Sequence, residues 1–202
     1  MACGRGSLHR MTDVRILPAA PDRWDDVVTL LGGDGDKGCW CQAWRGVEVR
    51  GEPRPDALRR QLAVNEVPPG FLAYLDGAAV GWAGVSVRTG TPRLVDSRTI
   101  PALDDLPVWS IGCFRIRPGY RRRGIAGALL DGVVAAAREA GAPGVEAYPI
   151  DPEGRRVGVG SAFVGLASMF DRAGFRRVLE TSAHSAGLPR LLVRLDLGPS
   201  GG

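Results

Sequence analysis

The order of elements between residues 107 and 150 constrains the fold of this chain more than any other feature of its sequence. An apolar run of strand length, PVWSIGCFRI (107–116), is followed by a short loop and a helical stretch over about 123–140. In that stretch small and apolar residues recur at helical spacing: Ile125, Leu129, Gly132, Val133, Ala136 and Ala140. Gly141 then ends the helix, and a second apolar run, GVEAYPI (144–150), begins. Two strands joined by one helix pair in parallel, so this segment predicts a βαβ unit.

The remaining segments extend this unit into one mixed-sheet α/β (α+β) domain with helices on both faces. We expect strands at 13–17, 70–88 (a hairpin turning at Asp76-Gly77), 174–181 and 190–197, and helices at 21–31, 54–66 and 162–173. Ser161 is the expected N-cap of the last helix, and 32–52 and 88–106 are expected loops, the second with a short helical turn. We expect residues 1–10 to be a disordered leader, 11–197 a single domain and 198–202 a flexible tail.

Composition excludes several classes of protein. The chain has 202 residues, 45% hydrophobic and 24% charged, which suits one globular domain. Its net charge is +4, but Lys37 is the only lysine among 26 basic residues, so the arginine excess reflects a compositional bias and does not by itself indicate nucleic-acid binding. A membrane-spanning apolar run and a signal-peptide core are both missing, which predicts a cytoplasmic protein with free cysteine thiols.

The loop before the long helix, RRRGIA (121–126), has the properties of an anion site. The first turn of a helix leaves its backbone N–H groups unpaired and carries the positive end of the helix dipole. Gly124 lets an anion approach the backbone, and the arginines add positive charge. Neither the Walker motif nor the Gly-x-Gly-x-x-Gly dinucleotide motif is present. The segment therefore predicts a pyrophosphate site of another kind.

These residues resemble the Gcn5-related N-acetyltransferase (GNAT) superfamily. Its signature, Arg/Gln-x-x-Gly-x-Gly/Ala, matches Arg121-x-x-Gly124-x-Ala126, and MFDRAGFRRV (169–178) is similar to the family's final helix and Gly-Phe strand. The resemblance implies acetyl-CoA or another acyl-CoA as co-substrate and a parallel strand pair splayed around it. The cofactor-binding residues that it implies are Phe114, Arg115, Ile116, Arg121, Arg122, Arg123, Gly124, Ile125, Ala126, Gly127 and Phe170.

One departure from the family and the choice of a base concern the chemistry of the reaction. Phe170 stands where the family commonly has a tyrosine that protonates the departing thiolate, which phenylalanine cannot do. A base is also needed to deprotonate the attacking ammonium. Glu146 and Tyr148 lie two residues apart in one predicted strand and so share a face of the sheet. We predict Glu146 as the base and Tyr148 as a hydrogen-bond donor, with ordinary strand packing as the alternative.

The segment CWCQAWR (39–45) places two cysteines and two tryptophans in the loop after the first helix. One Cys-x-Cys pair supplies too few ligands for zinc, so no metal is expected. By resemblance, this region lines the acceptor site, and Trp40 and Trp44 are the predicted substrate-binding residues. The Cys-Trp-Cys segment is similar to one bacterial subgroup of the family.

The resulting prediction is an acyl-CoA-dependent N-acyltransferase, most simply one that transfers acetyl to a primary amine by direct attack. The expected partner is a small-molecule or peptide amine, with neither a membrane nor a nucleic acid, and the protein is expected to be a monomer or a homodimer. Two alternatives stay open. One is a CoA-binding regulatory domain without catalysis, and the other is an RNA- or tRNA-directed acyltransferase.

Overall fold

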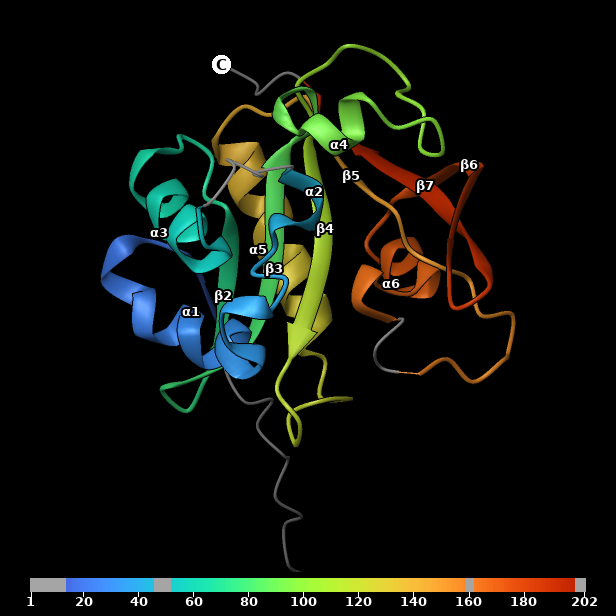
Figure 1. Cartoon of the computed structure of the whole chain (residues 1–202). Helices are drawn as coiled ribbons and strands as arrows, with labels where there is room; N and C mark the ends of the chain where they lie inside the picture. Colours follow the sequence, from blue (N-terminus) through green and yellow to red (C-terminus); the bar gives the residue numbers. More distant parts are fainter. Residues whose placement is uncertain (1–13, 46–51, 159–161, 199–202) are drawn as a thin grey trace, which may run out of the picture.

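A seven-stranded sheet forms the centre of the computed structural model, which describes residues 14–45, 52–158 and 162–198 (Figure 1). The strands are β1 (Arg15–Pro18), β2 (Gly70–Leu75), β3 (Ala78–Val87), β4 (Trp109–Ile116), β5 (Gly144–Ala147), β6 (Arg176–Ser185) and β7 (Leu188–Asp196). Their order is β1-β2-β3-β4-β5-β7-β6, and β4–β5 is the one parallel pair among the described strands. The predicted βαβ unit is therefore confirmed, with α5 (Ile125–Glu139) as its crossover.

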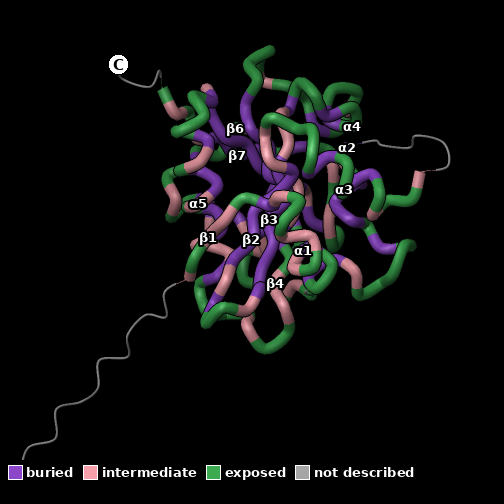
Figure 2. The backbone as a smooth tube through the Cα atoms, turned by 90° about the vertical axis from the view of Figure 1, so that its left-hand side faces the viewer, coloured by how far each residue is buried: buried purple, intermediate pink, exposed green. Residues whose placement is uncertain are grey.

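Helices cover both faces of the sheet, as expected. The other helices are α1 (Trp24–Leu31), α2 (Gln42–Arg45), α3 (Arg54–Val64), α4 (Pro92–Val95) and α6 (Ala167–Arg172), and the 3-10 turns are η1 (Pro21–Arg23), η2 (Gly32–Lys37), η3 (Arg88–Gly90) and η4 (Ala162–Val164). The apolar stripe of α5 and Phe170 of α6 enter one hydrophobic core. Apolar residues of α1 and α3 form a second core against Leu72 and Trp82 on the opposite face. Figure 2 shows that these central strands are mostly buried.

Three local features differ from the expectations. The loop predicted at 32–52 contains η2 and α2, because Trp40 and Cys41 adopt left-handed φ angles that turn the chain back onto the sheet. The helix predicted at 162–173 is divided into η4 and α6 at Gly165, whose φ is +85°. The final hairpin is longer than predicted and turns at Ala186-Gly187. The leader 1–10 and the N-cap Ser161 lie outside the described residues, as does the tail beyond 198.

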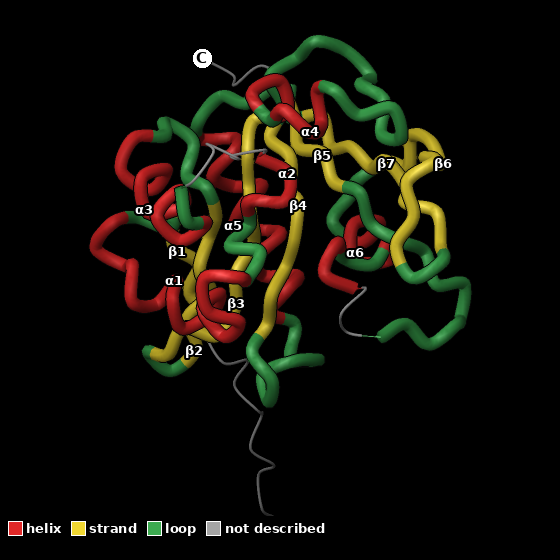
Figure 3. Tube along the Cα trace, viewed as in Figure 1, coloured by secondary structure: helices red, strands yellow, loops and turns green. Residues whose placement is uncertain are grey.

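The parallel pair β4–β5 is short, and this opens the sheet. Pairing runs from Trp109↔Val145 to Ile111↔Ala147 and then stops, and the two chains diverge in Figure 3. At the same point β4 carries a bulge: Ile111 pairs with Val85 of β3 and Cys113 pairs with Gly84, so Gly112 is the extra residue. Beyond Gly112, β4 is paired on its β3 side alone.

No helix in the described part of the chain is long and apolar enough to cross a membrane.

Candidate functional site

The start of α5 presents a row of unused backbone N–H groups. Among the described residues, no protein acceptor receives a hydrogen bond from the amides of residues 121–127, and the helix begins with the bond from Ala128 N to Gly124 O (3.0 Å). Arg122 and Gly124 have left-handed φ angles of +61° and +79°. Such alternation turns successive N–H groups toward a common point, which forms an anion-binding concavity. A Cβ at Gly124 or at Gly127 would meet no heavy atom within 4 Å, so the approach is open.

The arginines of this loop differ in their contacts. Arg121 donates from Nε to Ile116 O at 3.2 Å, and the Arg123 guanidinium lies 5.7 Å from the centre of the Tyr120 ring. Arg122 and Arg123 are exposed. The loop therefore combines free amides with long cationic side chains, an arrangement suited to a diphosphate.

The edge of β4 next to this loop has no strand partner on its β5 side among the described residues. Arg117 N donates to Val80 O (2.9 Å), so alternation along an antiparallel ladder turns the backbone of Arg115 toward β3. The N–H groups of Phe114 and Ile116 face the opposite side, where β5 has diverged. Of the three predicted residues, Phe114 and Ile116 thus offer backbone groups to an extended ligand, whereas the side chain of Arg115 extends toward Asp34 (3.9 Å).

Phe170 lies beside this edge but is fully buried. Its ring packs edge-on against Phe175, with ring centres 5.2 Å apart, and against Phe114 of β4 at 6.2 Å. Its position in the fold is therefore that of a support beneath β4. A hydroxyl group is missing from the ring, so Phe170 supplies no proton.

Glu146 and Tyr148 share one face, as predicted from their spacing, and form one buried polar cluster. The Tyr148 hydroxyl donates to Glu146 Oε2 at 3.3 Å and shares a 3.1 Å hydrogen bond with the Ser110 hydroxyl. The Glu146 carboxylate lies 3.2 Å from Arg194 Nη1 and 3.5 Å from Arg88 Nε. All five side chains are at most 3% exposed as residues. The sequence does not indicate Arg88 or Arg194, because tertiary structure alone brings the turn η3, which carries Arg88, and the strand β7, which carries Arg194, to Glu146.

The ionisation of this cluster is governed by burial. Burial raises the pKa of Glu146 above its usual value, although the Arg88 and Arg194 guanidinium groups oppose the shift. Burial also raises the pKa of Tyr148, and the adjacent Glu146 carboxylate adds to that effect. The tyrosine hydroxyl therefore keeps its proton over the physiological range and acts as a hydrogen-bond donor.

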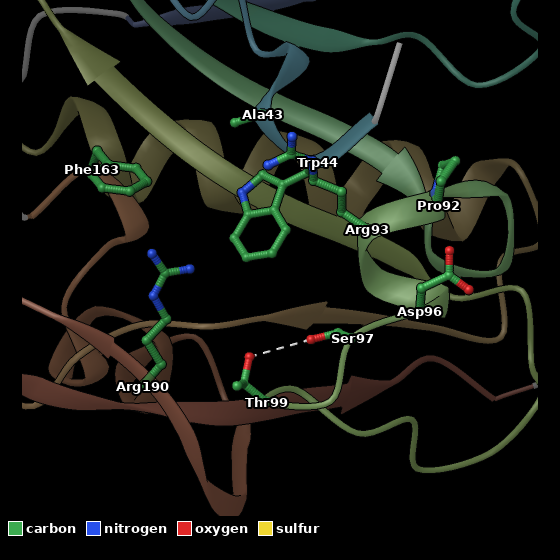
Figure 4. A pocket seen from close by; sticks show the side chains of 9 residues that line it. All are labelled: Ala43, Trp44, Pro92, Arg93, Asp96, Ser97, Thr99, Phe163 and Arg190. Carbon is green, nitrogen blue, oxygen red and sulfur yellow. Dashed lines mark hydrogen bonds between the residues drawn. The ribbon is translucent and has the colours of Figure 1, made fainter. Parts of the chain in front are cut away.

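A pocket of about 600 Å³ has Trp44 as one wall, and Trp44 lies between this pocket and the bulge at Gly112, where β4 and β5 diverge. Figure 4 shows the residues that line it: Ala43, Trp44, Pro92, Arg93, Asp96, Ser97, Thr99, Phe163 and Arg190. Trp44 connects the pocket to the bulge of β4, because its Nε1 donates to Gly112 O at 3.2 Å and its ring packs against Tyr148. The predicted substrate residue Trp44 is thus placed in the wall of a pocket.

Trp40, the other predicted substrate residue, is not in this pocket. Its ring stacks on Trp24 at 5.8 Å and its Nε1 donates to Gly35 O at 2.8 Å, so it is 4% exposed in the core between α1 and η2. The structure therefore separates the two tryptophans that the sequence places four residues apart. Trp40 fixes the turn that leads into α2, and α2 carries Trp44.

Of the two cysteines of CWCQAWR, Cys41 faces β4, whereas Cys39 is exposed. Cys41 Sγ lies 2.7 Å from Cys113 Sγ and accepts a 2.9 Å hydrogen bond from Trp82 Nε1. The hydrogen bond with Cys113 lowers the pKa of Cys41 to about 7, with Arg45 contributing, and the same contact together with burial raises the pKa of Cys113. Within the described ranges, no group of three or more His, Cys, Asp or Glu side chains is placed to hold a metal.

The family model for the acetyltransferase (GNAT) family matches residues 40–148, which include β4, the loop and α5. The chain belongs to the GNAT acetyltransferase family. The match begins at Trp40 and ends at Tyr148, so it spans the bulge, the free amides and the polar cluster. No curated protein matches the chain.

Many solved structures share this fold at low sequence identity. The loading GNATL domain of CurA from Lyngbya majuscula has a TM-score of 0.55 and 13% identity over 92% of this chain and 98% of its own. A GNAT acetyltransferase from Streptococcus pneumoniae has a TM-score of 0.55 and 15% identity, with 92% and 100% covered. A polyamine N-acetyltransferase from Drosophila melanogaster has 0.54 and 14%, with the same coverage. At these identities the likeness shows the GNAT fold alone.

Proposed function

We propose that this GNAT protein is an acyl-CoA-dependent N-acyltransferase that transfers acetyl from acetyl-CoA to a primary amine by direct attack. The observation that carries the proposal is the row of free amides at residues 121–127 next to the unpaired edge of β4. A diphosphate at these amides would place the attached pantetheine arm alongside Phe114 and Ile116. When bound, acetyl-CoA supplies the acetyl group as an activated thioester.

The residues around the bulge suit the acyl-transfer end of this arrangement. From Ile116 back to Gly112 the strand spans about 13 Å, the length of an extended segment of four residues. The arm would therefore run from the loop toward Gly112, where β4 and β5 diverge and where Trp44 separates the opening from the pocket. An amine held in that pocket would lie against Trp44, whose Nε1 donates to Gly112 O of the bulge.

For proton transfer we propose Glu146 as the group that accepts the proton of the amine, linked to the opening by the Tyr148 hydroxyl. Its raised pKa supports this role, because a general base works best when its pKa lies near the working pH. With Phe170 lacking a hydroxyl, the departing thiolate takes its proton from solvent. A thiol pKa of about 8.5 makes an unassisted thiolate an acceptable leaving group.

Calorimetry and thiol detection test the proposal together. We expect acetyl-CoA and CoA to bind saturably, and we expect free thiol to appear from acetyl-CoA only when a suitable amine is added. The reaction without an amine is the control for hydrolysis. An absence of heat with every CoA thioester would refute the proposal.

A second candidate, a CoA-binding domain without catalysis, is favoured by two observations: Phe170 carries no acid group, and Glu146 is enclosed by two arginines. In that case CoA would raise the melting temperature while no amine gave thiol release. A single active acceptor would exclude this candidate. An RNA-directed acyltransferase would instead require RNA affinity that falls steeply with salt.

A further inference from the structure

Among the residues that the structure describes, Arg190 of β7 differs from the other buried arginines because no polar partner contacts its guanidinium. It is 9% exposed, and its Nε has no hydrogen-bond acceptor. Among the described residues no carboxylate lies within 4.0 Å of its guanidinium. By contrast, Arg194 contacts three carboxylates, and Arg45 donates to three backbone carbonyls. A buried guanidinium without an anion is costly, so its retention requires a reason.

Two aromatic rings hold this guanidinium at the pocket. Its carbon lies 5.2 Å from the centre of the Trp44 ring and 5.6 Å from that of Phe163. Figure 4 shows the side chain extending from β7 toward both rings and into the pocket. Cation–π contacts of this kind orient the planar guanidinium but do not use its N–H donors, which lie in the plane of the group. Burial without a counter-ion also lowers the pKa of Arg190.

The partner of Arg190 is not the diphosphate of the cofactor. The free amides of residues 121–127 follow the end of β4 at Ile116, about 13 Å along the strand from Gly112, where Trp44 and the pocket meet β4. The pocket thus lies at the opposite end of the site from the phosphates. That is the end at which the amine acceptor enters in the proposed function.

We propose that this pocket binds an amine acceptor that also carries a carboxylate, as an amino acid does, and that Arg190 binds the carboxylate. The inference rests on the proposed function and names its class of substrate. A guanidinium fork matches the two oxygens of a carboxylate. Asp96 also lines the pocket, and its negative charge disfavours a phosphate dianion there more than a single carboxylate. In Figure 4, Asp96 lies across the pocket from Arg190, where it attracts the ammonium of a zwitterion.

The experiment compares each standard L-amino acid with its own C-terminal amide, which keeps the amine and removes the carboxylate charge. Binding to the full chain is measured by saturation-transfer NMR, with and without CoA, and thiol release from acetyl-CoA is measured in parallel. We expect at least one amino acid to bind roughly 10- to 100-fold more tightly than its amide, the range for hydrogen bonds to a charged group. Arg190→Met should abolish that difference and raise KM for the amino acid by the same factor.

Two further variants separate this role from a structural one. Arg190→Lys keeps the charge but loses the planar fork, so it should recover a part of the preference. Arg155→Met, at an exposed position, should change nothing. CoA affinity that is unchanged in Arg190→Met shows that the fold is intact. Equal binding of amino acids and amides, or no binding of either series to a protein that binds CoA, overturns the inference. If the unmodified protein does not bind CoA, the proposed function itself is refuted.

Discussion

Gly124 offers a sharp test of the diphosphate site because two variants there differ only in charge. Its φ of +79° is left-handed, and a Cβ would meet no heavy atom within 4 Å. Asn and Asp tolerate this conformation better than other residues with a Cβ, so both Gly124→Asn and Gly124→Asp should lower the free energy of unfolding by about 1 kcal/mol. Urea unfolding measures this loss, which should be equal in the two variants.

Only the aspartate should repel a diphosphate. Two like unit charges about 5 Å apart repel by about 3 kcal/mol at an effective dielectric constant of 20 and by less than 1 kcal/mol in water. Because Gly124 is exposed, we expect about 1.4–2.7 kcal/mol, which corresponds to CoA binding about 10- to 100-fold weaker in Gly124→Asp than in Gly124→Asn. Calorimetry at about 0.05 M and about 0.5 M NaCl should show the gap shrinking with salt. Equal affinities of the two variants at low salt would refute the placement of the phosphates.

Three further predictions concern the interior. The ultraviolet absorbance of the Cys41 thiolate should appear with a midpoint near pH 7, be lost in Cys41→Ser, and move to higher pH in Cys113→Ser. Because the pKa of Cys41 is lower in the folded protein than in the unfolded chain, the stability that this thiolate contributes is lost as the pH falls through about 7. Gly132→Ala should lower the free energy of unfolding by about 1–2 kcal/mol in urea, since its Cβ would lie 2.6 Å from Cγ2 of Ile16, and Ile16→Ala should relieve the loss. If Glu146 is the base, the rate of thiol release should fall as the pH is lowered, with a midpoint above 4.5. A Glu146→Gln protein whose rate shows the same fall at low pH would contradict the assignment.

The elements that the sequence predicts well are those whose signal is local. The stripe of α5 and the Asp76-Gly77 turn each depend on a few neighbouring residues, and both are present in the structure. The helix predicted at 162–173 shows the limit of such patterns. A Cβ at Gly165 would lie 2.7 Å from the Phe170 ring, and its left-handed φ ends the helical turn, a constraint that the spacing of apolar residues does not contain.

The candidate site shows the same division. The residues of the anion loop are contiguous, so their grouping is visible in the sequence. Trp40 and Trp44 are also close in sequence, yet the left-handed turn at Trp40 and Cys41 sends one into a core and the other to the pocket. Nothing local indicates Arg190, because its environment consists of two rings from distant segments and, in the described part of the chain, contains no counter-ion.

The sequence by itself determined the order of the elements, the parallel crossover and the cationic glycine turn that begins α5, since each follows from backbone preferences over a few residues. Tertiary structure alone decided where β4 and β5 diverge, which buried charges neutralise one another, and that Arg190 lies between two aromatic rings at the pocket. Those outcomes depend on contacts between residues far apart in the chain, whose energies are set by burial and by the charges that meet there.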